Sequence, residues 1–144
     1  MLRGQKVSFR ASKTDLKRLY ACNRESALVW NECLQLAKEY FLQYGRWISK
    51  SELQKQTKGK FHLHSQSIQA VCHKYVFARQ SAQKAIQQGL HHTRYPYKKK
   101  KHSNTKWAKD GFKVYENGKI ELSMGIHNGK REMANSAWHC SPNY

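Results

Sequence analysis

Acidic residues are scarce in this sequence, which has only 9 Asp and Glu against 27 Lys and Arg among its 144 residues. The formal net charge is +18 with the eight histidines counted as neutral. Such a surplus attracts polyanions, and binding to phosphate is further favoured by the release of counterions. The composition therefore favours a nucleic-acid partner over a surface that is basic only for solubility.

Long apolar runs are also missing. No segment reaches the ~18 consecutive apolar residues that a transmembrane helix requires, and the sequence has no lipidation motif. Residues 1–6 lead into an alternating stretch without the apolar region of a secretory signal. We therefore expect no membrane partner, and a reducing cytoplasmic location as the default.

Patterns for metal binding and catalysis are absent too. No two of the four cysteines have CxxC spacing (Cys22, Cys33, Cys72 and Cys140), and the first three fall in helical patterns typical of buried, reduced thiols. The histidines within residues 62–64 and 91–92 have no cysteine or carboxylate at ligand spacing. Two-metal cleavage of a phosphodiester needs clustered carboxylates, whereas the acidic residues are scattered along the chain. We expect no cofactor, no metal ion and no enzymatic activity from these residues.

Three segments have apolar residues at steps of three and four, which is typical of amphipathic helices. Capping residues and glycines set their expected limits. These are Ser12 or Thr14 to Gly45 for the first helix, Ser49 to about Thr57 for the second, and Ser65 or Ser67 to Gly89 for the third. Asn23 and Asn31 are unusual inside the first helix, and we expect them to bridge to a neighbouring element rather than to catalyse.

Two segments have the pattern of strands. Gln5 to Ala11 alternates between apolar and polar residues, which predicts a half-buried strand, and residues 112–124 predict a β-hairpin. A three-residue loop that ends on a left-handed Gly118 would pair Val114 with Ile120 and Phe112 with Leu122. This register keeps the apolar side chains on one face, whereas a two-residue loop would not. From Met133 onward the sequence has no period and predicts no regular structure.

The best candidate site is the basic connector between the third helix and the hairpin, from Leu90 to Gly111. It interleaves lysines with aromatic residues, namely Tyr95, Tyr97, Lys98, Lys99, Lys100, Lys101 and Trp107. The lysines would neutralise phosphates, and the rings could stack on unpaired bases. The alternative is a solvated linker whose aromatic residues pack in the core. Like charges and one proline favour an extended backbone.

A second candidate is the polar face at the opening of the third helix. Its N-terminal residues could read base edges in duplex DNA, and glutamine can pair with adenine through two hydrogen bonds. These residues are Ser65, Gln66, Gln69 and His73, and the cations Lys74, Arg79 and Lys84 farther along could contact backbone phosphate. Ordinary capping and a solvent-exposed face would explain the same residues equally well.

Several segments, taken in order, carry a family resemblance. Beyond the opening strand and helix they are Trp30-Asn31, Ser65-Gln66-Ser67, residues 78–89, Tyr95-Pro96-Tyr97-Lys98-Lys99-Lys100 and Gly118-Lys119-Ile120. In this arrangement the sequence resembles the N-terminal part of the transposon-encoded OrfB/TnpB family, the accessory transposases that act as RNA-guided DNA nucleases. The resemblance extends to about Gly129 and rests on the order and spacing of the segments.

The resemblance implies an α+β fold. In that family the early and late strands form a small wedge-type barrel, and a helix-turn-helix-like insert of three helices lies between them. Applied to this chain, the parts are the first strand (1–13), the helical insert (14–90), the connector and hairpin (91–132), and an atypical tail (133–144). Together the family's parts hold a guide-RNA scaffold and read the short DNA motif beside the target, while base pairing supplies the remaining specificity.

Family members continue into a RuvC-like nuclease domain with acidic metal ligands and a four-cysteine zinc element, and neither is found in this sequence. The expected protein is therefore a truncated, non-catalytic member that binds guide RNA, double-stranded DNA or both, near the prokaryotic nucleoid. The tail from Met133 would fit a frameshifted or read-through end. Two alternatives stay open: a stand-alone helix-turn-helix regulator that binds DNA, and an inert product of a decayed transposon.

Overall fold

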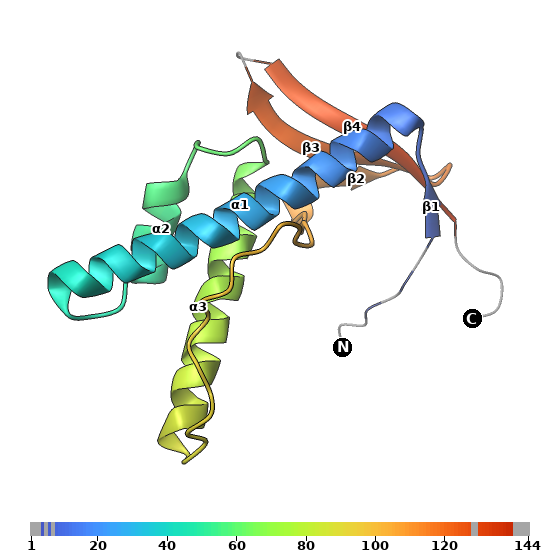
Figure 1. The fold of residues 1–144 in the computed structure, drawn as a ribbon. Helices are drawn as coiled ribbons and strands as arrows, with labels where there is room; N and C mark the ends of the chain where they lie inside the picture. Colours follow the sequence, from blue (N-terminus) through green and yellow to red (C-terminus); the bar gives the residue numbers. More distant parts are fainter. Residues whose placement is uncertain (1–3, 5, 7, 128–129, 140–144) are drawn as a thin grey trace.

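The computed structural model describes residues 4, 6, 8–127 and 130–139 (Figure 1). The described residues form a mixed α+β fold with three α-helices, a short 3-10 helix and four strands. In chain order the elements are β1 (Ser8–Arg10), α1 (Lys13–Tyr44), α2 (Lys50–Thr57), α3 (Ser65–Gln87), η1 (Lys109–Gly111), β2 (Phe112–Val114), β3 (Lys119–His127) and β4 (Lys130–His139).

The helices begin and end close to where their capping signals predict. The side chain of Ser12 accepts a hydrogen bond from the Asp15 amide at the start of α1, and Ser49 does the same for Glu52 at the start of α2. Gly45 ends α1 in a left-handed conformation. Helix α3 begins at Ser65, one of the two expected starts, and its N-cap is His64, whose side chain accepts a hydrogen bond from the Gln66 backbone N–H. The Ser67 hydroxyl is buried and donates to the Lys106 carbonyl.

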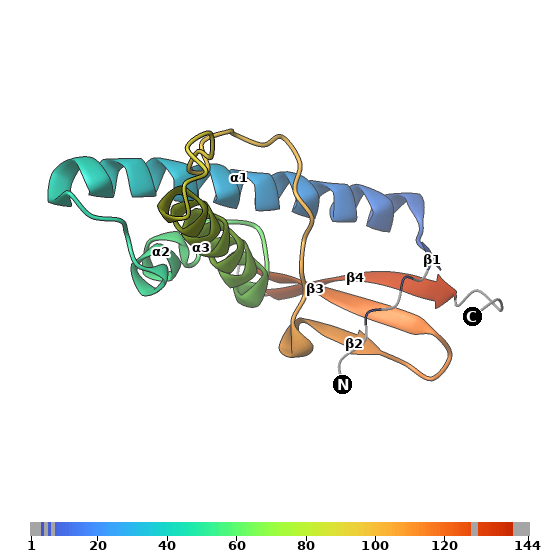
Figure 2. The same cartoon turned by 90° about the horizontal axis from the view of Figure 1, so that it is seen from below.

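Helix α1 extends along the whole molecule and organises the core. Its N-terminal half lies over the sheet, and its C-terminal half lies over α2 and α3 (Figure 2). Trp30 of α1 meets Tyr75 of α3 edge to face, with ring centroids 5.8 Å apart. Cys33 and Val29 are fully buried in the same core cluster. The apolar stripes of α1 and α3 therefore pack against each other, as their spacing predicts.

The strands form one antiparallel sheet in the order β1-β4-β3-β2. Strand β2 pairs with β3 so that Val114 opposes Ile120 and Phe112 opposes Leu122. Gly118 has a positive φ of 85°, which a three-residue hairpin loop requires at this position. The register and the loop type of the hairpin are thus confirmed.

Three expectations about the strands require correction. Residues 133–139 belong to β4, which pairs with both β3 and β1, although no structure was predicted from Met133 onward; residues 140–144 lie outside the described residues. Strand β1 is short, and Phe9 is 48% exposed rather than half-buried against the sheet. The two edge strands, β1 and β2, do not pair with each other, so the described strands form an open sheet and not the barrel that the resemblance implies.

The sheet joins the helical part through the middle of β3. Met124 is buried in the common core, and the Cys22 thiol donates to its sulfur at 3.0 Å. The next residue, Gly125, lies so close to the loop before α3 that a Cβ there would be 2.6 Å from the carbonyl oxygen of Leu63. This close approach brings the sheet against the opening of α3. Within the described residues, no helix combines the length and the apolarity needed to cross a membrane.

Candidate nucleic-acid interface

The basic connector crosses α1 as an extended chain that is hydrogen-bonded to the helix (Figure 2). The indole N–H of Trp30 donates to the Lys98 carbonyl at 3.1 Å. The Asn31 side chain donates to the Lys100 carbonyl at 2.9 Å and accepts from the Lys100 amide at 2.8 Å. The path of the connector is therefore set by side chains of α1, not by regular secondary structure.

A second group of hydrogen bonds holds the connector farther along. The Ser103 amide donates to the Asn23 carbonyl, and the Thr105 hydroxyl donates to the Asn23 side chain at 2.9 Å. The buried Ser26 hydroxyl lies 2.8 Å from the hydroxyl of Thr105. Asn23 and Asn31 thus bridge to a neighbouring segment, as their position inside an apolar helix predicts.

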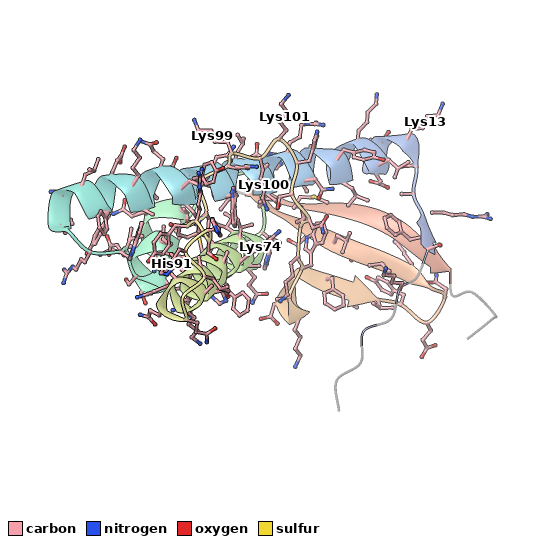
Figure 3. All side chains as sticks on the ribbon, turned by 60° about the horizontal axis from the view of Figure 1, so that its bottom comes forward. Lys13, Lys74, His91, Lys99, Lys100 and Lys101 are labelled. Carbon is pink, nitrogen blue, oxygen red and sulfur yellow. The ribbon has the colours of Figure 1, made fainter. Side chains whose placement is uncertain are left out.

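The lysines of the connector differ in their exposure. Lys98, Lys99 and Lys101 are exposed, whereas Lys100 is half-buried with its ammonium 4.1 Å from the ring centroid of Trp30. Figure 3 shows Lys99, Lys100 and Lys101 together where the connector passes α1. Burial and the nearby charge of Lys74 lower the pKa of Lys100. Like charges gathered in this way are favoured by a bound polyanion.

The three aromatic residues predicted for this site have different surroundings. Tyr97 is 57% exposed, and the cationic groups of Arg94 and Lys98 lie 5.9 and 6.0 Å from its ring centroid. Tyr95 is half-buried against the ring of Trp47. Trp107 packs against the core, and its indole N–H donates to the Ser123 carbonyl at 2.8 Å. Tyr97 is therefore exposed to solvent, whereas Trp107 joins the connector to the sheet.

The opening of α3 is partly engaged within the molecule. The side-chain amide of Gln66 donates to the carboxylate of Asp110 at 3.2 Å. The His73 ring shares a hydrogen bond of 2.7 Å with the side chain of Gln54 in α2. Ser65 and Gln69 are exposed. Two of the four side chains predicted to read bases thus have intramolecular partners.

The cations farther along α3 separate into two groups. Lys74 and Lys84 are exposed and available to a phosphate. Arg79 is only 7% exposed, and its guanidinium lies 5.6 Å from the ring centroids of both Trp47 and Tyr75. The prediction that Arg79 contacts phosphate needs correction, because its charge is buried between aromatic rings of the core.

A groove of about 390 Å³ between α3 and the connector brings the predicted residues His73 and Lys74 together with Phe77 and Asn104, which the sequence did not single out. Its lining includes Lys74, Asn104 and Lys106, together with the exposed ring of Phe77. Burial, followed by the charges of Lys50 and Lys106, lowers the pKa of His73 at the same groove. Phe77 occurs four residues after His73 on the polar face of α3, and this position was the available sequence signal.

Comparisons with known proteins add no relative: scans of protein-family models, curated proteins and solved structures each found no match. Among the residues that the structure describes, no three metal-ligating side chains converge. What the geometry offers is a cationic, aromatic-lined surface on an ordered connector. Such a surface can bind phosphates and stack on bases.

Proposed function

We propose that this protein binds nucleic acid through the basic connector, with Lys98, Lys99 and Lys101 as the principal phosphate contacts. The observation that carries the proposal is that hydrogen bonds from α1 fix the connector backbone while these three side chains stay exposed. A cationic segment that is ordered before binding loses less conformational entropy when its partner arrives. Lys74 would extend the same surface onto α3.

The bound molecule is proposed to be a guide-RNA scaffold together with the DNA beside its target. This part of the proposal depends on the resemblance to the N-terminal part of the OrfB/TnpB family, in which strand, helices, basic connector and hairpin follow in the same order. The open sheet would then correspond to a portion of the family's wedge-type barrel. The role proposed for these residues is binding and not catalysis.

The helix-turn-helix alternative has less support from the geometry. A recognition helix offers its N-terminal side chains to base edges, whereas Gln66 and His73 of α3 are hydrogen-bonded to Asp110 and Gln54. If α3 nevertheless reads duplex DNA, affinity should survive ribonuclease treatment and be abolished when Gln66 and Gln69 are replaced. An inert product of a decayed transposon would show no cooperative melting transition.

The test is the salt dependence of binding to a structured RNA and to a DNA duplex. Replacing Lys98, Lys99 and Lys101 by Gln should weaken the salt dependence. The negative slope of log K against log salt should become less steep by about 0.7–0.9 for each phosphate that the variant no longer neutralises. The matched control replaces Lys17, Lys55 and Lys58 by Gln. These lysines are exposed and lie outside the connector, and the control variant has the same net charge as the test variant. Equal slopes for the two triple variants would contradict the proposal, because binding would then depend on total charge alone.

A further inference from the structure

A cleft of about 450 Å³ lies between the C-terminal half of α1 and the start of the connector. Six of its thirteen lining residues carry rings, which are Phe41, Trp47, Tyr75, Tyr95, Pro96 and Tyr97. The volume falls within the roughly 300–1,000 Å³ typical of ligand sites. The rings come from three segments that are distant in the sequence, so sequence periodicity does not predict the cleft.

Trp47 is the centre of the aromatic wall. Its ring centroid lies 4.7 Å from that of Phe41 and 4.9 Å from that of Tyr95. The buried guanidinium of Arg79 packs against Trp47 as well, at 5.6 Å. Contacts from several elements thus hold the wall in place, while Phe41 and Tyr97 remain 41% and 57% exposed. Rings that are fixed and open to solvent suit a flat, apolar group.

The mouth of the cleft is cationic. Lys38 and Lys99 are exposed and contribute to its lining. The cationic groups of Arg94 and Lys98 lie close to the ring of Tyr97. The neighbouring acid on α1, Glu39, accepts a hydrogen bond from Gln35 at 2.8 Å. A partner that fits this arrangement therefore combines a flat apolar ring with negative charge.

We propose that the cleft binds an unpaired nucleotide, with its base against the rings of Phe41 and Tyr97 and its phosphates at Lys38 and Lys99. This inference rests on the proposed function, since the connector that supplies the phosphate contacts also supplies one side of the cleft. An unpaired base can leave its strand and stack on an aromatic ring, whereas the bases of a duplex are already stacked on each other. The charges at the mouth favour a nucleotide over an uncharged helix or a second copy of this basic chain.

The experiment compares strands that carry the same phosphates with and without bases. Oligonucleotides of about 12 residues are used in three forms: oligo-uridylate, oligo-thymidylate and an abasic strand of equal length. The native protein should bind the base-bearing strands about 5- to 150-fold more tightly than the abasic strand, as ~1–3 kcal/mol of stacking implies. Tyr97→Leu and Phe41→Leu should remove most of the ratio between the affinities for base-bearing and abasic strands. Both variants should leave the affinity for the abasic strand unchanged.

Tyr20→Leu is the matched control, because it removes an exposed ring on α1 that lines neither the cleft nor the groove between α3 and the connector, and it should keep the ratio. Circular dichroism melting checks that each variant is folded. A preference restricted to the RNA or to the DNA strand supports the proposal and identifies the strand.

Equal affinity of the native protein for base-bearing and abasic strands would overturn the cleft proposal and leave the proposed function standing. Failure to bind any strand at low salt would overturn both. The cleft proposal also fails if Tyr97→Leu converts a dimer to a monomer in sedimentation while the ratio stays the same, because the occupant would then be a second copy of the chain.

Discussion

Asn31 and Lys100, which lie 69 residues apart, are joined by two hydrogen bonds between a side-chain amide and a backbone. The amide nitrogen of Asn31 donates to the Lys100 carbonyl, and its oxygen accepts from the Lys100 N–H. A single side chain in the middle of α1 thus satisfies both polar groups of one connector residue. The neighbouring Lys99 and Lys101 consequently extend from a backbone whose position is fixed.

Replacing Asn31 by Ala should destabilise the protein by about 1–3 kcal/mol, because both backbone groups of Lys100 would be left without their hydrogen bond. We also expect weaker RNA binding, since the connector would have to become ordered on association. Urea unfolding and fluorescence anisotropy measure the two effects. Gln43→Ala, at an exposed position of the same helix, is the control. If RNA affinity is unchanged in Asn31→Ala, preordering of the connector does not contribute to binding.

The contact between the sheet and the loop before α3 predicts a strong effect of Gly125→Ala. The added Cβ would lie 2.6 Å from the Leu63 carbonyl oxygen, and φ at this residue is +93°. We expect a destabilisation of about 2 kcal/mol or more, measured by thermal or urea unfolding. Gly45→Ala is a matched comparison, because φ there is +70° but no atom lies within 4 Å of the new Cβ. Equal destabilisation of the two variants would show that the close approach to Leu63 has no energetic consequence.

Local signals in the sequence were sufficient to predict most of the regular structure. The caps at Ser12 and Ser49 determine where two helices begin, because a side-chain oxygen there satisfies a free backbone N–H. The position of Gly118 determines the hairpin register, because few other residues adopt a positive φ at low cost. Strand β4 was missed because its pairing with β3 and β1, and not its own alternation, defines it.

The candidate site was predictable only in part. The exposed lysines of the connector are evident from composition, but the bonds that order them depend on Trp30 and Asn31, which are distant in the sequence. The sequence pattern also does not distinguish an exposed cation from one that is buried between aromatic rings. Arg79 is of the second kind. Tertiary packing decides these assignments, and it also forms the cleft around Trp47.

The buried thiols should be protected from alkylation by inaccessibility. Burial raises the pKa of Cys22 to about 11, whereas hydrogen bonds from Cys33 and Thr57 lower the pKa of Cys72 to about 7. Cys72 is nevertheless fully buried. In a Cys140→Ser background, we expect iodoacetamide to modify all three thiols at least about a hundredfold more slowly in the folded protein than in urea. Site-resolved mass spectrometry measures the rates, and fast modification of Cys72 in the folded state would contradict the packing described.

The groove between α3 and the connector predicts a pH dependence that runs in opposite directions for folding and for binding. Burial and the charges of Lys50 and Lys106 lower the pKa of His73 in the folded protein. The contribution of His73 to stability is therefore present above its ordinary pKa of about 6.5 and is lost as the pH falls through the lowered value. Phosphates placed near these lysines would raise the pKa of His73 again, so binding should take up a proton.

Affinity for RNA should accordingly increase as the pH falls from about 7.5 to about 5.5, because the complex takes up a proton at this residue. His73→Gln keeps a polar partner for Gln54 and should remove this part of the pH dependence. His92→Gln, an exposed histidine outside the groove, controls for the general effect of histidine charge. Anisotropy titrations at constant ionic strength measure both profiles. Identical profiles for the native protein and His73→Gln would mean that the bound phosphates do not reach this groove, because proton uptake at His73 requires them to offset the charges of Lys50 and Lys106.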